Sequence, residues 1–222
     1  MVAKLKHTLK WWRHDARLDA LRKKGMHIGR DVHCPPSLYI DEEYCALISI
    51  GDSTSLGPEC APVAHDPALD GSHGVTVVGT ITLHASTHVG ARTIVGPGVE
   101  VGPRTIVAAG SVVSRSLPPD TVCWGNPARP YSTLEQYLET HHARAQSGRR
   151  FAYMDYSIQY LDESRRSELV AAAVAGDAYI VGGRSAEIGG IGGSVRTPRG
   201  TYVPPGPRSW SDRPPPGGST RS

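Results

Sequence analysis

Among the ten histidines of this chain, His65 has the setting best suited to acid–base chemistry. A neutral imidazole can take a proton from a hydroxyl near pH 7 and hand it on to a leaving group. A repeating pattern in the sequence stops at His65, and residues 67–74 show no repeat. We therefore expect His65 at the mouth of a projecting loop, where catalytic groups are common. The next residue, Asp66, either orients the imidazole or caps a turn.

Two further groups of residues raise the question of a metal. His84 and His88 are four residues apart, but the sequence fixes no third partner for them, so we expect surface histidines and no metal. The four cysteines form no CxxC pair and no disulfide framework. Cys34 and Cys60 fall at inward positions of the pattern described next, and we expect them to be small core residues.

The elements that would hold these residues follow a period of six. Beginning at Val77 and stepping by six gives only branched aliphatic residues: Val77, Leu83, Val89, Val95, Val101, Val107 and Val113. The positions four further on are small or β-branched: Ile81, Thr87, Thr93, Val99, Thr105 and Ser111. A helix needs a period of 3.6 and a strand a period of two, so neither element explains the pattern.

A short internal period predicts a stacked coil. Each six residues would supply one short strand and one corner, with the aliphatic side chain inside. Three such units would complete a turn, and the turns would stack at roughly the 4.8 Å spacing of paired strands. The pattern is less regular between residues 26 and 64, where residues 41–47 interrupt it. We therefore predict an all-β solenoid over residues 26–131.

Three other segments differ in character. Residues 1–25 carry eight basic residues on an amphipathic helical pattern that ends at Gly25. This helix either caps the open end of the coil or makes peripheral contact with an anionic membrane. Residues 132–183 are expected to be a helical extension, with a capping box at Ser132 and Glu135 and a second helix from about Tyr156 to Ala175. Residues 184–222, rich in Gly, Pro and Ser, are expected to be a disordered tail.

Several motifs from about residue 26 to residue 129 resemble the hexapeptide-repeat acyltransferases. They are Ile50-Gly51-Asp52, Ala64-His65-Asp66, the run from Val101-Gly102 to Val112-Val113, and Leu117-Pro118-Pro119-Asp120 with Gly125-Asn126-Pro127-Ala128-Arg129. The last combination is typical of the galactoside/maltose and polysaccharide O-acetyltransferase branch. The resemblance implies a left-handed parallel β-helix and a homotrimer with active sites between subunits.

The resemblance also implies an activity and a set of site residues. It implies an acetyltransferase that moves an acetyl group from acetyl-CoA to a hydroxyl of a sugar or glycan, with His65 as general base in a direct transfer. By alignment, Ala91 and Ala109 take positions along the groove for the pantetheine arm, and an amide such as that of Ala91 would face the thioester oxygen. The remaining positions that the family uses for coenzyme A are Ser114, Arg115 and Arg129. His88 stands where the family often has Trp, which alters how the pantetheine arm packs.

Composition and charge narrow the alternatives. The net charge of +3 is too small to indicate nucleic-acid binding, and one Phe against 25 Gly and 18 Pro disfavours a helical bundle. No signal peptide or membrane span is evident, which predicts a cytoplasmic protein, at the inner membrane surface if residues 1–25 contact lipid. Three other functions stay open: an N-acetyltransferase for an amino sugar, a metal-dependent hydratase resembling γ-class carbonic anhydrases, and a non-catalytic β-helix scaffold.

Overall fold

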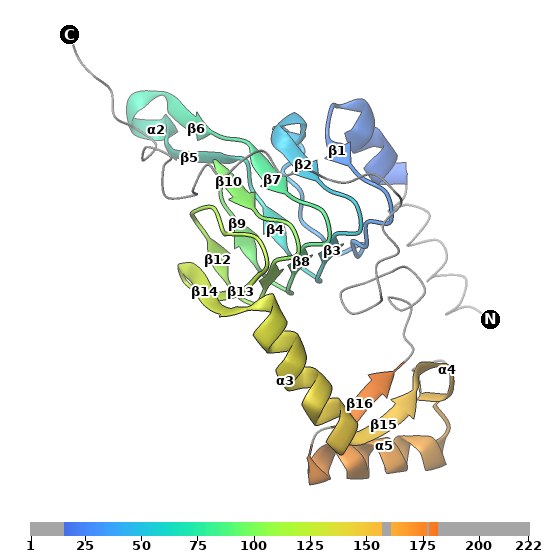
Figure 1. Ribbon diagram of the computed structural model, residues 1–222. Coiled ribbons are helices and arrows are strands. Elements are labelled where there is room, and N and C mark those ends of the chain that lie inside the picture. Colours follow the sequence, from blue (N-terminus) through green and yellow to red (C-terminus); the bar gives the residue numbers. More distant parts are fainter. Residues whose placement is uncertain (1–15, 157–160, 177, 182–222) are drawn as a thin grey trace, which may run out of the picture.

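The computed structural model describes residues 16–156, 161–176 and 178–181. Most of the described strands pair in parallel and form three sheets around one apolar core, and Figure 1 shows these strands stacked side by side. The first sheet contains β1 (His27–Ile28), β2 (Ile48–Ile50), β7 (Ile81–Leu83) and β10 (Val99–Val101). The second contains β3 (Ser55–Leu56), β8 (His88–Val89), β11 (Ile106–Val107), β13 (Thr121–Gly125) and β14 (Ala128–Thr133). The third contains β4 (Ala61–Pro62), β9 (Ile94–Val95) and β12 (Val112–Val113).

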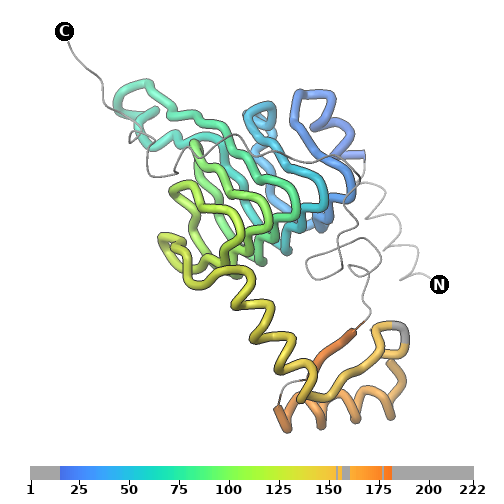
Figure 2. Tube along the Cα trace, in the orientation of Figure 1, coloured from blue at the N-terminus to red at the C-terminus, as the bar shows by residue number. Residues whose placement is uncertain are grey.

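The chain visits the three sheets in rotation, so that successive turns lie next to one another (Figure 2). Val99 pairs with Ile81, Ile106 with His88 and Val112 with Ile94, a step of 18 residues in each case. Three periods of six therefore make one turn, as the sequence pattern predicted. We call the bends between the first and second sheets the first corner, those between the second and third sheets the second corner, and those between the third and first sheets the third corner.

The two inward series of the pattern form the core. From Leu83 to Val113 every aliphatic position of the first series is buried, and so is every position of the second series from Ile81 to Ser111. The hydroxyls of the second series donate to backbone carbonyls at the corners, as Thr87 does to His84 and Thr105 to Pro118. These bonds satisfy the only polar atoms that those side chains bring into the core.

The prediction that Val77 starts the inward series is wrong. The Val77 side chain is 48% exposed, because it belongs to a hairpin that leaves the coil and not to an inward row. The hairpin consists of β5 (His65–Leu69), the short helix α2 (Asp70–His73) and β6 (Val75–Val78), and β5 and β6 pair in antiparallel fashion. The projecting segment after His65 is therefore confirmed. The predicted interruption at residues 41–47 is also confirmed, since it contains no strand and includes the 3₁₀ turn η1 (Cys45–Leu47).

The described part of the basic segment, from residue 16 to Gly25, packs on the first turn of the coil. Residues 16–23 are helical, and Gly25 follows with a φ of +99°. Leu18 and Leu21 are buried in the same core cluster as the strands, which favours the cap over the membrane contact. The rest of the predicted helix, with Trp11 and Trp12, lies outside the described residues. Among those described, no helix has the length and apolar character that crossing a bilayer requires.

The segment after the coil differs from the helical extension that was predicted. Its first helix, α3 (Leu134–Ser147), is capped by Thr133 and not by Ser132, since the Gln136 N–H donates to the Thr133 hydroxyl. Two strands that the sequence interpretation missed, β15 (Arg149–Ala152) and β16 (Ala178–Val181), then pair in parallel. Between them lie α4 (Tyr153–Tyr156) and α5 (Glu163–Ala175), so the predicted second helix begins later than expected. The predicted tail lies outside the described residues.

Candidate active site

The imidazole of His65 is held by a buried carboxylate. His65 Nδ1 lies 2.5 Å from Oδ2 of Asp41, whose side chain is only 2% exposed, whereas the His65 side chain is 21% exposed. His65 is the first residue of β5, where the hairpin leaves the third corner, and Asp41 begins the interruption of the coil. The two residues are 24 positions apart and meet only because the coil brings its first turns together.

The partners of Asp41 fix which nitrogen of His65 carries a proton. Asp41 Oδ2 also accepts the Ala64 N–H at 3.0 Å, and Oδ1 accepts the Tyr44 N–H at 3.3 Å. A carboxylate surrounded by donors is an acceptor, so His65 donates its Nδ1–H to it. The Nε2 atom of the neutral ring then carries a lone pair and can accept a proton. The Tyr44 ring lies against the imidazole with the ring centroids 4.9 Å apart and restricts its rotation.

Asp66 lies elsewhere. Its carboxylate is exposed and accepts the Ala68 N–H at 2.9 Å within the hairpin. Of the two roles that the sequence left open for Asp66, this hydrogen bond corresponds to the turn cap. The carboxylate that contacts the His65 ring is that of Asp41, which the sequence interpretation missed.

The hairpin places apolar side chains next to His65. His65 pairs with Val78 across the two strands. Four large apolar residues of the hairpin are exposed: Leu69, Val75, Val77 and Val78. The His65 imidazole therefore lies at the edge of an exposed apolar surface. Such a surface is typical of a site that binds a substrate or a second protein chain.

Ala91 and Ala109 stack on the second corner, in adjacent turns. The turns approach very closely here: a Cβ atom on Gly90 would lie 2.4 Å from the Ala109 nitrogen, and one on Gly57 would lie 2.4 Å from the Ala91 nitrogen. Both alanines are at least partly exposed, and neither amide donates to an acceptor among the described residues. The second corner therefore offers a narrow stack of small residues. His65 lies on the third corner, so a single chain does not bring these residues together.

The arginines at the corners fall into two groups. Arg30, Arg92 and Arg104 each form an ion pair with a carboxylate of a neighbouring turn, at 2.6 to 2.8 Å. Arg115, beside Ser114 on the third corner, and Arg129, in the β13–β14 hairpin, have no carboxylate partner among the described residues. The three polar positions matched to the family, Ser114, Arg115 and Arg129, are all exposed. The guanidinium of Arg129 donates one N–H to the Ala128 carbonyl.

His84 and His88, the two histidines considered as metal ligands, do not converge on a common site. His84 Nε2 lies 3.5 Å from Oε2 of Glu100, on the outside of the first corner. His88 lies on the outer face of the second sheet between Ser55 and Ile106. Burial lowers the pKa of His88, and the charge of His33 lowers it further. Within the described ranges, no three His, Cys, Asp or Glu side chains gather as metal ligands do.

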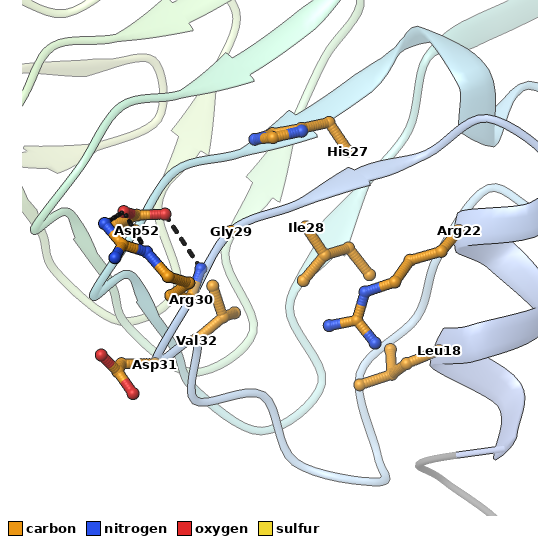
Figure 3. A pocket seen from close by; sticks show the side chains of 9 residues that line it. All are labelled: Leu18, Arg22, His27, Ile28, Gly29, Arg30, Asp31, Val32 and Asp52. Carbon is orange, nitrogen blue, oxygen red and sulfur yellow. Dashed lines mark hydrogen bonds and ion pairs between the residues drawn. The ribbon is translucent and has the colours of Figure 1, made fainter.

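A pocket of about 650 Å³ lies at the first corner of the first turns (Figure 3). Arg30 and Asp52 line it and are joined by three hydrogen bonds, two from the guanidinium and one from the Arg30 N–H. These bonds hold the pKa of Asp52 below its usual range. Since the pair ties two adjacent turns together, we interpret this pocket as part of the scaffold. It contains none of the residues that the sequence singled out for chemistry.

The strand arrangement and the His65–Asp41 pair define a β-rich protein with a partly buried histidine–carboxylate pair at the edge of a repeating coil. The chain is similar to known acetyltransferases. It is 29% identical to the galactoside O-acetyltransferase of Escherichia coli over 111 residues, which cover 47% of this chain and 52% of that protein. It is 32% identical to a putative acetyltransferase of Schizosaccharomyces pombe over 93 residues, which cover 40% of this chain and 45% of the relative.

Among solved structures, a hexapeptide-repeat acetyltransferase of Vibrio cholerae in complex with acetyl-CoA is 26% identical, with a TM-score of 0.44, over 54% of this chain and 78% of that one. No family model matches the chain. The chain spans about half the length of the two curated relatives. The relatives confirm the resemblance to acetyltransferases that the sequence motifs indicated.

Proposed function

We propose that this protein is a coenzyme A-dependent O-acetyltransferase that acetylates a hydroxyl of a sugar or glycan. The observation that carries the proposal is the His65–Asp41 pair at 2.5 Å, at the base of an apolar hairpin. The name of one relative, a galactoside O-acetyltransferase, supports the transferred acetyl group and the acceptor class. The finer fold that we propose is the left-handed parallel β-helix of the family.

The chemistry is a direct transfer. His65 Nε2 removes the proton from the acceptor hydroxyl as the oxygen attacks the thioester carbonyl. The imidazolium that forms is stabilised by the Asp41 carboxylate through the Nδ1–H bond. As the tetrahedral intermediate collapses, the carbon–sulfur bond breaks and Nε2–H returns the proton to the departing sulfur. The products are the acetyl ester and free coenzyme A, and His65 is again neutral.

The thioester oxygen gains negative charge during the attack and needs a donor. The Ala91 amide is suited to this role because it is partly exposed and has no acceptor among the described residues. Ala109 continues the same stack of small residues, which leaves room for a pantetheine arm. Arg115, with Ser114 beside it, and Arg129 are suited to bind phosphate, because neither has a carboxylate partner among the described residues. The other described corner arginines are paired between turns.

The separation of these residues favours a homotrimer. His65 and the Ala91–Ala109 stack occupy the two corners that border the third sheet. The outer face of this sheet presents an apolar row formed by Ala61, Ile94 and Val112 in register. If copies of the chain meet across this face, the third corner of one copy approaches the second corner of the next. One copy would then supply the base and its neighbour the donor-binding stack.

The proposal is tested by mass spectrometry of sugars incubated with acetyl-CoA and the protein. The panel pairs each amino sugar with the corresponding sugar that has only hydroxyls. We expect a gain of one acetyl group in hydroxyl-only sugars, and we expect mild alkali to remove it because it is an ester. An alkali-stable product formed only on amino sugars would show N-transfer instead. Intact acetyl-CoA with every sugar would contradict the proposed activity.

A further inference from the structure

Two large aromatic side chains are exposed on the hairpin that closes the coil. Trp124, in β13, is 60% exposed, and Tyr131, in β14, is 69% exposed. Their ring centroids are 5.8 Å apart, and the rings are inclined at 76°, so the edge of one ring faces the other. This arrangement holds both rings in place while it leaves ring surface open to solvent. The acetyl-transfer chemistry proposed above makes no use of either ring.

The hairpin fixes the Trp124 ring beside the donor-binding stack. The Ala108 N–H donates to the carbonyl of Cys123, and the Gly125 N–H donates to the hydroxyl of Ser111. Trp124 lies between these two anchored residues of β13, and Ala109 lies between their two partners. Trp124 is therefore located at the second corner, one turn after Ala109, and Tyr131 lies beside it on β14.

Arg129 supplies a positive charge at the same place. It is the register partner of Trp124 across the hairpin. Its guanidinium has one N–H on the Ala128 carbonyl and no carboxylate partner among the described residues, so further donors remain for an anion. An aromatic surface next to an unpaired arginine suits a ligand that combines a flat base with phosphate.

We propose that Trp124, held by Tyr131, is the stacking surface for the adenine ring of the donor, next to the phosphate that the proposed function gives to Arg129. The inference rests on the proposed function, because it places the nucleotide end of coenzyme A at the second corner. Trp124 would then determine affinity for the nucleotide part of the donor and take no part in the transfer step.

The test is calorimetric titration of coenzyme A into the full chain and its variants. Stacking on an aromatic side chain contributes enough that Trp124→Ala should weaken coenzyme A binding by about 5- to 150-fold. Trp124→Phe keeps a ring and should restore most of the affinity, whereas Trp124→Leu should not. Val174→Ala removes another exposed side chain, on α5 and away from the site, and should bind as wild type does. Adenosine 3′,5′-bisphosphate should compete with coenzyme A for the wild type and compete poorly for Trp124→Ala.

The outcomes separate this inference from the proposed function. If the wild type and Trp124→Ala bind coenzyme A equally, the stacking role is wrong while the acetyltransferase proposal stands. If the wild type does not bind coenzyme A at all, the proposed function fails. Light scattering tests whether the two rings form a subunit contact instead. If Trp124→Ala loses both coenzyme A affinity and its oligomeric state, and Trp124→Leu restores both, the rings are a subunit contact and the inference is overturned.

Discussion

Replacing Asp41 by asparagine removes the charge behind His65 with almost no change of shape. The amide oxygen can still accept the Ala64 N–H and the His65 Nδ1–H, and its NH₂ group then faces the Tyr44 N–H, whose bond to Oδ1 is the longest of the three at 3.3 Å. The site should therefore stay assembled. The loss is that a neutral amide replaces a carboxylate opposite an imidazole that becomes positively charged during the reaction.

The size of the effect follows from the type of hydrogen bond. A hydrogen bond to a charged partner contributes about 1.5–3 kcal/mol. At 1.36 kcal/mol per tenfold, Asp41→Asn should lower kcat by about 10- to 150-fold. The KM for acetyl-CoA should change little, since Asp41 is buried behind the imidazole and does not face the donor. The assay is the initial rate of thiol release from acetyl-CoA in the presence of an acceptor.

Asp66→Asn is the matched control, because it makes the same chemical change next to the same histidine. The Asp66 carboxylate is exposed and bonds only the Ala68 N–H among the described residues. Exposed substitutions usually cost less than about 0.5 kcal/mol, so its rate should stay within about twofold of the wild type. A slow Asp66→Asn enzyme beside a normal Asp41→Asn enzyme would refute the reasoning and give the orienting role to Asp66.

Three further predictions concern the coil. Gly90→Ala places a Cβ atom 2.4 Å from a backbone nitrogen and should lower the free energy of unfolding, measured in urea, by about 1–3 kcal/mol or more. In Gly96→Ala the nearest atom to the new Cβ is 3.6 Å away, so this variant should be neutral or slightly stabilised. Equal stabilities of the two variants would contradict the close stacking of turns. Burial raises the pKa of the thiols of Cys60 and Cys123, so iodoacetamide at mildly alkaline pH should label them only after denaturation, and rapid labelling of the folded protein would oppose their burial. Burial lowers the pKa of His88, so near pH 6.5 the unfolded chain binds a proton at this residue and the folded chain does not. The free energy of unfolding should therefore fall as the pH drops from about 6.5 toward the lowered pKa. His88→Gln should reduce this fall, and an unchanged pH dependence would argue against the prediction.

The sequence predicted the coil well because its core imposes a strict rule. Each turn has few inward positions, and a residue such as Val89 or Thr105 must be both small enough and of the right polarity to fill one. The period fails at Val77 for a physical reason. Alternating valines also suit an exposed antiparallel hairpin, and the period alone does not separate the two environments.

The site was only half predictable from sequence. His65 could be found because it stands where the repeat ends, but Asp41 is 24 residues away, in a segment that the pattern marks only as an interruption. No local spacing links the two residues, since the stacking of turns joins them. The sequence shows Asp41 directly after the apolar Ile40, but only the structure shows that both side chains are buried. The strands β15 and β16 were missed because four residues are too few to distinguish a strand from the adjoining helices.

The central claim is that His65 is the base that activates the acceptor. The most direct measurement is the rate of thiol release from acetyl-CoA by the wild type and by His65→Ala, at saturating donor and with an acceptor found by mass spectrometry. General-base catalysis contributes about 10²- to 10⁴-fold, and the account predicts a loss of that size with coenzyme A affinity retained. Equal rates for the two proteins would contradict it.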